Sequence, residues 1–453
     1  WICLLCLCFL SLQAQAGRKK VLECPGFVWA NTSEIEFKRM ILTEEQTQVD
    51  AVMYGKPGTP LVISSQAMLK GANGAVARLR EADKISIDGV TEPEVIGEDG
   101  RLEVTLSFAP LQSDVHEVDF VEPEMGWNIF GIQLSRKEPY VYVPNFLTSD
   151  PSMDSNELPE PGLSEGKSVV NGYILGYDSK MTLLGELVYE DGLFPQPWTL
   201  PVKIRQDGSF HLETELYQPV LTSLKLGEAT LSLFLVPDEE LTVYIHLPRL
   251  SMSCSHLLGR HYEKKEKAWF DGAAETINRE LSVGNKSALE AYQAVEKDLM
   301  ERPEIAGKLK ADSEKVKPVC ERLLAASSLT SDDAKILRTL EFPEIRTYVE
   351  TVAQALQLNA ARVVPTKEAV VASLDAQVAG ADILPRIIAP HKGRAILIDF
   401  WATWCGPCRK SMQAMLPLKK TLASKDIVYI YLTGPSSPES IWKAALSKMT
   451  GVH

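Results

Sequence analysis

The sequence predicts a multidomain chain with β-sandwich-like domains on the N-terminal side, a helical segment, and an incomplete α/β domain at the C-terminal end. Three observations predict this order. Apolar and polar residues alternate through the first half, helix-capping signals appear after residue 255, and a strand–helix–strand pattern begins at Ala395. The 453 residues correspond to about three domains of roughly 150 residues each.

The composition limits the classes of partner. Hydrophobic residues make up 45% of the chain and charged residues 24%, which is typical of a protein with buried cores. The net charge is −13. Nucleic acids and anionic membrane surfaces attract clustered positive charge, so we expect no nucleic-acid partner.

Residues 1–16 predict part of a secretory signal peptide. The apolar run of residues 1–12 is shorter than a membrane-spanning helix, and Ala14-Gln15-Ala16 has the small-x-small pattern that signal peptidase cleaves. No Met and no basic stretch precede the run, so we expect the chain to begin inside the signal. Retention of the run as an anchor is the alternative, because basic residues 18–20 follow the site directly. Cleavage would leave a mature chain without a transmembrane span.

Residues 17–146 predict a β-sandwich-like domain. In Arg101–Phe108 every second residue is apolar, as expected for a strand with one buried face. Leu61–Ile63, Ile85–Val90 and Tyr140–Val143 are further strand candidates separated by turns.

A linker and a second β domain follow. Residues 147–168 are rich in Pro, Gly and acidic residues and poor in apolar ones, so they predict a linker. Residues 169–250 alternate again and predict a smaller β domain. Within it, Asp207-Gly208 is typical of a hairpin turn.

Residues 255–378 predict a helical region. Ser287-x-x-Glu290 and Thr330-x-x-Asp333 have the capping-box pattern that starts a helix. An apolar stripe at helical spacing comprises Val316, Val319, Cys320 and Leu323. On this stripe, Cys320 is expected to be a buried small hydrophobe. Sequence leaves open whether Cys24 and Cys254 pair.

Residues 380–453 predict an α/β domain. Ala395–Phe400 and Ile427–Leu432 are apolar enough to be buried strands. A helix between them requires a right-handed crossover and parallel pairing of the two strands. Ser437-Pro438-Glu439 then has the residues that start another helix, with Ser at the cap.

The pentapeptide Trp404-Cys-Gly-Pro-Cys408 predicts dithiol chemistry. Cys405 is expected at the start of a helix, where unpaired N–H groups and the helix dipole lower the pKa of a thiol. We therefore expect Cys405 to attack a substrate disulfide and Cys408, three residues later, to resolve the mixed disulfide and form the redox-active Cys405–Cys408 bond. Gly406 permits a tight turn, and Pro407 lacks an N–H at a position that needs none.

Asp399 is the polar residue in an apolar strand. We expect its carboxyl group to be buried and to exchange a proton with the resolving sulfur. The alternative is a surface Asp at a strand end.

Two other chemistries fit the motif less well. A zinc site needs about four ligands, and the sequence offers no second C-x-x-C and no paired His, so we predict no metal site. A peroxidase would need Pro and Thr or Ser at set offsets before its cysteine, and these are missing. We predict no cofactor.

Residues Ile398 to Arg409, which read I-D-F-W-A-T-W-C-G-P-C-R, resemble the TlpA/ResA-like branch of the thioredoxin superfamily. These are thiol–disulfide oxidoreductases of the cell envelope, usually reductases. The resemblance implies that Cys405 and Cys408 are the nucleophile and the resolving thiol, and that Asp399 is the buried acid. It also implies that Trp404, Gly406 and Pro407 bind substrate.

The architecture is similar to that of secreted multidomain proteins of Bacteroidota, on strings such as Asp207-Gly-Ser-Phe210. In the family, two antiparallel strands, a cis-Pro and a last helix follow this part of the fold. The resemblance therefore implies a chain truncated at both ends.

The sequence thus predicts an exported oxidoreductase of the periplasm or cell envelope. Its partners would be protein thiols and disulfides and an upstream envelope electron donor. The alternative is a secreted binding or scaffold protein whose thioredoxin-like part is a docking module. The presence of both thiols favours the enzyme.

Overall fold

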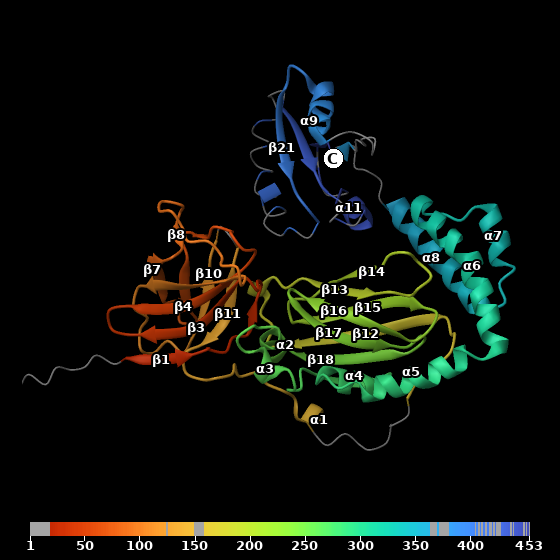
Figure 1. Ribbon diagram of the computed structural model, residues 1–453, viewed down its shortest axis with the longest axis horizontal. Helices are drawn as coiled ribbons and strands as arrows, with labels where there is room; N and C mark the ends of the chain where they lie inside the picture. The colour runs from red at the N-terminus through yellow and green to blue at the C-terminus, as the bar shows by residue number, and fades with distance from the viewer. Residues whose placement is uncertain are drawn as a thin grey trace, which may run out of the picture. The chain divides into compact units, whose positions relative to one another are not determined.

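The computed structural model describes residues 19–123, 126–148, 158–362, 369–370 and 380–403, and part of the chain beyond (Figure 1). Beyond residue 403 the described residues are 405, 408, 411–412, 415, 419, 422, 427–434, 437, 439–446, 449 and 451–452. The predicted signal peptide, residues 1–16, lies outside the described residues. The chain divides into a larger unit, Trp1–Glu321 with Ser331–Val349, and a smaller unit, Arg322–Thr330 with Glu350–His453.

The first part of the larger unit consists of β-strands, drawn red to orange in Figure 1. Nine of them hydrogen-bond in the order β1-β3-β4-β9-β7-β6-β10-β11-β2, and β5 pairs with β8. The strands are β1 (Lys20–Glu23), β2 (Trp29–Ala30), β3 (Ile35–Leu42), β4 (Thr47–Tyr54), β5 (Val62–Ile63), β6 (Met68–Gly71), β7 (Val76–Asp83), β8 (Ser86–Ile87), β9 (Arg101–Phe108), β10 (Glu117–Val121) and β11 (Asn128–Gln133). Their inward side chains form one core, in which Met40, Leu106 and Phe120 are fully buried.

The strand predictions in this region hold where one face is buried. The predicted strand Arg101–Phe108 is confirmed as β9, and Val104, Leu106 and Phe108 are its buried side chains. The prediction for Tyr140–Val143 is wrong, because these residues lie outside any strand. Tyr140 and Tyr142 are 74% and 66% exposed, so the alternation there has no buried face to stabilise it.

Two stacked four-stranded sheets form the second part of the larger unit, drawn yellow to green in Figure 1. Their orders are β15-β12-β18-β19 and β14-β13-β16-β17. The strands are β12 (Gly166–Leu175), β13 (Gly185–Tyr189), β14 (Trp198–Val202), β15 (Ser209–Leu216), β16 (Val220–Leu226), β17 (Ala229–Leu235), β18 (Glu240–His246) and β19 (Ala268–Gly272). Both sheets contribute to one core, for example Val243 from the first and Leu224 from the second.

Two expectations for this region need correction. Residues 268–272 were expected to be helical, but they form β19, because the run Ala268-Trp269-Phe270 pairs antiparallel with β18. Asp207-Gly208 is a turn, with Gly208 at φ +80°, where a side chain would be strained. However, β14 and β15, the strands on either side of it, belong to different sheets, so the turn closes no hairpin between them.

Short helices connect the strands, and longer ones follow them. They are α1 (Asn145–Thr148), η1 (Ser179–Met181), α2 (Leu247–Ser253), α3 (Gly259–Tyr262), α4 (Glu275–Ser282), α5 (Ser287–Met300), α6 (Pro303–Ala326), α7 (Ser331–Leu337) and α8 (Pro343–Arg362). Within the described ranges, no helix combines the length and the apolarity that a membrane span requires.

One of the sequence predictions for the helical region is confirmed and another is wrong. The stripe of Val316, Val319, Cys320 and Leu323 is confirmed, since all four are fully buried on α6. The capping box at Ser287 is wrong. Ser287 is the first residue of α5 itself, after Lys286 at the cap position, and its amide donates to Asn285 Oδ1.

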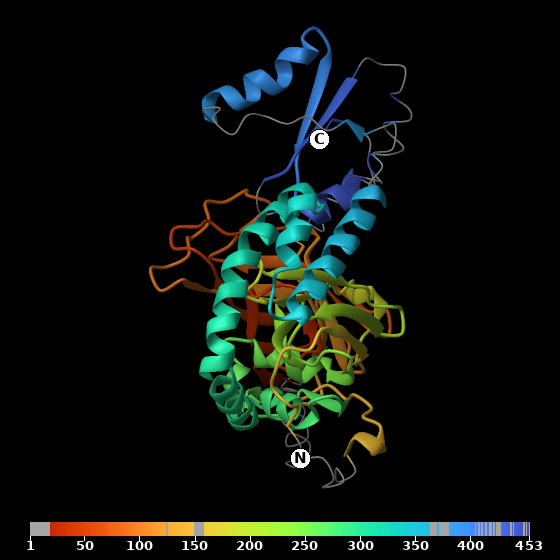
Figure 2. The ribbon, with the colours of Figure 1, turned by 90° about the vertical axis from the view of Figure 1, so that its right-hand side faces the viewer.

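The smaller unit contains a parallel sheet of order β20-β23-β22-β21. Its described elements are β20 (Ala369–Val370), α9 (Gly380–Ile388), η2 (Ala389–His391), β21 (Ala395–Phe400), β22 (Ile427–Leu432), α11 (Glu439–Leu446) and β23 (Gly451–Val452). Figure 2 shows α9 leading through a short connection into β21. The predicted parallel pairing of residues 395–400 with 427–432 is confirmed.

The burial predicted for Ala395–Phe400 is wrong. Among the described strands β21 lies at the edge of its sheet, with β22 as its neighbour. Its side chains are half-buried or exposed, and Phe400 is 73% exposed. In contrast, β22 lies inside the sheet, and Val428, Ile430 and Tyr431 are buried.

Candidate functional site

The predicted dithiol motif follows β21 directly. Beyond the end of the strand, the amide of Trp401 still donates to the carbonyl of Leu432 at 2.9 Å. This bond keeps the chain attached to β22 for one more residue. Trp401, Ala402 and Thr403 are buried, so the segment that leads to Cys405 is fixed by packing as well as by hydrogen bonding.

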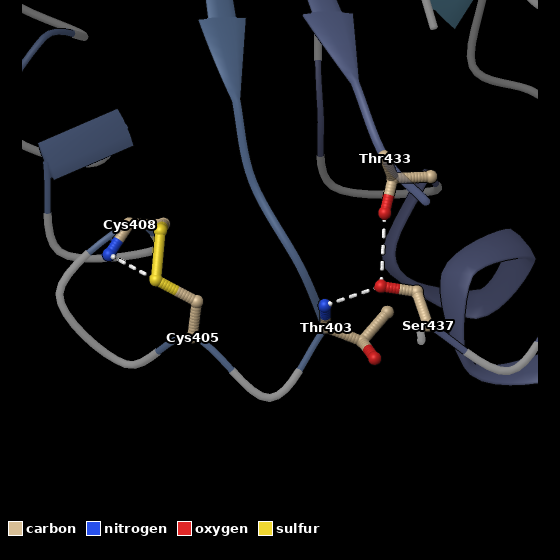
Figure 3. Close-up of a disulfide and its surroundings, with 5 residues drawn as sticks. All are labelled: Thr403, Cys405, Cys408, Thr433 and Ser437. Atoms are coloured by element: carbon tan, nitrogen blue, oxygen red, sulfur yellow. Dashed lines mark hydrogen bonds between the residues drawn. A yellow bond between two sulfur atoms is a disulfide. The ribbon is translucent and has the colours of Figure 1, made fainter. Parts of the chain in front are cut away.

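Cys405 and Cys408 form a disulfide, with their Cα atoms 5.3 Å apart. The N–H group of Cys408 donates to the sulfur of Cys405 at 3.2 Å, as Figure 3 shows. Cys408 and Lys419 are each in a helical conformation. An N–H donor stabilises a sulfur anion more than a neutral thiol, so this contact favours the thiolate form of Cys405 after reduction.

A second set of hydrogen bonds ties the motif to the far end of β22 (Figure 3). The hydroxyl of Ser437 accepts the N–H of Thr403 at 3.0 Å, and it accepts the hydroxyl of Thr433 at 2.8 Å. Both Ser437 and Thr403 are buried. Sequence reasoning placed Ser437 at a helix cap and missed this contact, because nothing local connects residues 34 positions apart.

Asp399 lies on a face of the sheet that also carries two tyrosines and a lysine. It is directly opposite Tyr431 across the β21–β22 pair, and Tyr429 points to the same side two residues earlier. Lys419 Nζ lies 4.6 Å from the ring centre of Tyr429 and 4.6 Å from that of Tyr431. Asp399 is half-buried rather than buried as expected, because β21 is the edge strand.

The charges on this face act on one another. Burial lowers the pKa of the Lys419 ammonium, and the carboxylate of Asp399 acts in the opposite direction. Burial raises the pKa of Tyr431 to about 12, with the charge of Asp399 adding to the effect. Tyr431 is therefore a neutral phenol at physiological pH. Lys419 was missed in the sequence, where it is one of two adjacent lysines.

The other predicted site residues and cysteines are placed as follows. Trp404, Gly406 and Pro407 lie outside the described residues. Cys24, Cys254 and Cys320 are free thiols, of which Cys24 is half-buried, Cys254 exposed and Cys320 buried. Within the described ranges, no three His, Cys, Asp or Glu side chains are grouped so that they could hold a metal ion.

A C-x-x-C pair that follows the first strand of a parallel strand–helix–strand unit is typical of dithiol redox domains. Comparison with known proteins narrows this class. Residues 386–432 match the thioredoxin family model. The match includes β21, both cysteines and β22, so the smaller unit contains a thioredoxin domain at these residues.

The relatives are thioredoxins or thioredoxin-like. "Thioredoxin-like protein YneN" of Bacillus subtilis (strain 168) is 56% identical over 49 residues, 11% of this chain and 29% of the relative. "Thioredoxin" of Coprinus comatus is 41% identical over 39 residues, 9% of this chain and 37% of the relative. "Thioredoxin-1" of Caenorhabditis elegans is 44% identical over 46 residues, 10% of this chain and 36% of the relative. The chain thus spans about a third of the length of these relatives.

Among solved structures, a pullulanase from Anoxybacillus sp. LM18-11 aligns with 42% of this chain and 24% of its own. The identity is 10% and the TM-score 0.15, so this likeness carries no argument about fold or function. The predicted thioredoxin domain is confirmed for residues 386–432.

Proposed function

We propose that this chain is an exported thiol–disulfide oxidoreductase of the TlpA/ResA-like type that works as a reductase in the periplasm or cell envelope. The observation that supports it most directly is the donation from the Cys408 N–H to the Cys405 sulfur at 3.2 Å. This bond favours the thiolate on one of the two sulfurs and so supports the proposal that Cys405 is the attacking atom.

The reaction balances between two dithiol pairs. The Cys405 thiolate attacks a substrate disulfide, forming a mixed disulfide and releasing one substrate thiolate. Cys408 loses its proton to Asp399 and attacks Cys405, which forms the Cys405–Cys408 disulfide and releases the second substrate thiolate. The proton then passes from Asp399 to solvent or to the departing thiolate. A donor dithiol from the envelope reduces the Cys405–Cys408 bond again.

The export part of the proposal rests on residues 1–16. The apolar run and the Ala14-Gln15-Ala16 site have the features of a cleaved signal. The β-rich larger unit would then position the thioredoxin domain or recruit its protein substrates outside the cytoplasm.

A redox titration of the full chain tests the proposed function. The protein is equilibrated with ratios of reduced and oxidised dithiothreitol, and the state of Cys405 and Cys408 is read by alkylation and peptide mass spectrometry. We expect a reversible two-electron transition with a midpoint below about −200 mV, as for a reductase. A midpoint near −120 mV would instead indicate an oxidase. If the pair formed no reversible disulfide, the enzyme hypothesis would be wrong and a docking role would replace it.

A further inference from the structure

The sheet β15-β12-β18-β19 of the larger unit carries an exposed aromatic group on its outward face. The core residues of these strands alternate with residues that point away from the other sheet. Among the outward residues, Tyr173 of β12 is paired with Tyr244 of β18, and their rings are stacked with centroids 5.0 Å apart. Phe146 of α1 meets the ring of Tyr244 edge to face at 5.7 Å. Tyr173 is 43% exposed and Phe146 is 65% exposed, and contiguous aromatic surface in contact with water is typical of an interaction site.

Two exposed carboxylates lie beside these rings, around the small side chain of Thr242. Strand register puts Asp271 of β19 opposite Thr242, and Glu240 is two residues before Thr242 on the same side of β18. Tyr244 is two residues after Thr242, so Asp271 is its diagonal neighbour, at a spacing of about 7–8 Å. Burial raises the pKa of Tyr244, and the nearby Tyr173 and Asp271 add to the effect, in agreement with this spacing.

The four strands hold more negative than positive charge on this face. Their acidic residues are Glu213, Glu215, Glu240 and Asp271, and Lys167 is their one lysine or arginine. Lys167 already pairs with Glu213 at 3.0 Å. Within the part of the chain that the structure describes, no lysine or arginine forms an ion pair with Glu240 or Asp271. The charge that complements the surroundings of Thr242 is therefore positive.

The carboxylate of Glu240 is held in place by its neighbours on the sheet. The side-chain amide of Asn171, which is opposite Thr242 on β12, donates to Glu240. The amide oxygen of Asn171 is in turn hydrogen-bonded to Nδ1 of His211 at 2.8 Å. A carboxylate accepts several hydrogen bonds, so Glu240 retains capacity for a further donor. Side chains that are already ordered lose less entropy when a ligand binds.

We propose that this face binds the arginine side chain of an extended basic peptide, with the guanidinium over Thr242, beside the aromatic group, and its N–H groups donating to Glu240 and Asp271. Arginine fits better than lysine, because its planar guanidinium stacks on a ring and presents several N–H donors at once. The partner would be a protein with an exposed basic segment. The inference rests on the proposed function only in the role it gives this partner, as a substrate recruited by the larger unit.

A neutral sugar is the other ligand that exposed tyrosines could bind by stacking. A sugar would gain from the rings but little from the negative charge of the two carboxylates. The affinity for a cation, in contrast, falls when a carboxylate is neutralised or when salt screens it. Charge and salt dependence therefore distinguish the two ligands.

The experiment measures binding to the full, oxidised chain by isothermal titration calorimetry. The probe is a short capped peptide of glycine and serine that contains two arginines. The matched peptide has citrulline, which is similar in shape but uncharged, in place of arginine. The protein variants are Asp271→Asn, Glu240→Gln, the double variant, Tyr173→Leu and Tyr173→Phe. Glu186→Gln is the matched control, because it removes one carboxylate from the outward face of the other sheet.

We expect the arginine peptide to bind the wild type with a Kd of about 100 µM or lower, and the citrulline peptide to bind at least about tenfold more weakly. Asp271→Asn and Glu240→Gln should each weaken binding about fivefold, and the double variant at least about tenfold. Raising sodium chloride from about 50 to about 500 mM should weaken it about tenfold. Tyr173→Leu should weaken it about threefold, whereas Tyr173→Phe retains the ring and should bind like the wild type.

Two results overturn the inference: equal affinity for the two peptides, including no binding of either, or a double carboxylate variant that binds as tightly as Glu186→Gln. Binding of cellohexaose in place of the arginine peptide, lost in Tyr173→Leu but not in the double variant, would assign the face to a sugar and overturn it as well. If Tyr173→Leu does not fold, the carboxylate variants, at exposed positions, still decide. None of these results affects the proposed function, which fails on the redox titration of the cysteine pair.

Discussion

The larger and smaller units each contain a cysteine whose surroundings decide its reactivity, and the two surroundings act in opposite ways. In the larger unit Cys320 is fully buried on α6, and burial, together with the charge of Asp191, raises the pKa of its thiol to about 12. In the smaller unit the sulfur of Cys405 is half-buried and receives the N–H of Cys408. The same residue type is thus an inert core group in one unit and a candidate nucleophile in the other.

The two carboxylates differ in the same sense. Asp191 is buried and accepts the indole N–H of Trp198 at 2.7 Å and the hydroxyl of Tyr348 at 2.6 Å. Asp399 is half-buried, and its charge acts on the ammonium of Lys419. A carboxylate surrounded by fixed neutral donors stabilises a structure, whereas one that solvent reaches can exchange a proton. The comparison teaches that solvent access and donor geometry, more than residue type, mark the reactive site.

The largest expected effect is on disulfide reduction by the cysteine pair of the smaller unit. Cys405→Ser should lower disulfide reduction by at least about 10³-fold, because the variant lacks the sulfur proposed to attack the substrate. Cys408→Ser should retain the attack and accumulate mixed disulfides through Cys405. Non-reducing gels and mass spectrometry of trapped adducts measure this. Cys320→Ser is the control and should leave turnover unchanged. Equal trapping by both serine variants would contradict the assigned roles.

The next prediction compares the alkylation rates of Cys405 and Cys320. In the reduced protein at pH 7.5, iodoacetamide should modify Cys405 at least about 10³-fold faster than Cys320, since a thiol with a pKa near 12 is almost entirely protonated. Peptide mass spectrometry over time gives both rates. Exposed Cys254 serves as an ordinary reference thiol. Modification of Cys320 at the rate of Cys254 in the folded protein would show that it is not sealed in the core.

The sequence predicted those parts of the structure that local pattern controls. Arg101–Phe108 and the α6 stripe were found because burial on one face imposes a period of two or of 3.6 on neighbouring residues. Tyr140–Val143 has the same alternation without a buried face, so its pattern was misleading. The dithiol motif was found because its chemistry is contained in five consecutive residues.

Contacts set by strand register or by packing between distant segments were not predictable. Lys419 lies over the ring of Tyr431, which is opposite Asp399, only because β21 and β22 pair in one particular register and a helical residue packs on the face of β22. In the larger unit, Glu36 accepts the amide of Leu257, 221 positions away, and nothing in either local sequence indicates it. Long-range polar contacts of this kind depend on the whole fold, and a single sequence does not contain them as a pattern.

A smaller effect concerns the stability of the larger unit at acidic pH. His246 is buried, and its Nδ1 accepts the amide of Arg249 at 3.3 Å, which requires the neutral ring. Burial, with the charge of Arg249, lowers the pKa of His246 from 6.5 to about 4. A lowered folded-state pKa gives stability that is complete above pH 6.5 and is lost as the pH falls toward 4, in total about 3 kcal/mol.

The His246→Asn variant tests this, because asparagine keeps an acceptor for Arg249 but does not titrate. Urea unfolding, followed by hydrogen exchange in a peptide covering β18 and α2, compares the variant with wild type at each pH. Between pH 7.5 and 4 we expect the wild type to lose about 3 kcal/mol more than the variant. His261→Asn, at an exposed histidine, should behave like wild type. Parallel losses in wild type and His246→Asn would rule out His246 as the acid-sensitive group.

The smallest expected effect lies in the smaller unit, at the hydrogen bonds that hold the segment before the motif. Ser437→Ala leaves the buried N–H of Thr403 without its acceptor, which costs about 1–2 kcal/mol of local stability. Hydrogen exchange in a peptide covering residues 401–405 should then be about tenfold faster at fixed pH. Ser437→Thr retains the hydroxyl and should exchange close to the wild-type rate. Stopped-flow measurement of nitrothiobenzoate release from 5,5′-dithiobis(2-nitrobenzoate) by the same reduced variants then shows what this hydrogen bond contributes to the chemistry. If Ser437 positions the motif, the attack by Cys405 and the resolution by Cys408 should slow together. Unchanged exchange in Ser437→Ala would mean that packing of Trp401 and Ala402 alone holds this segment.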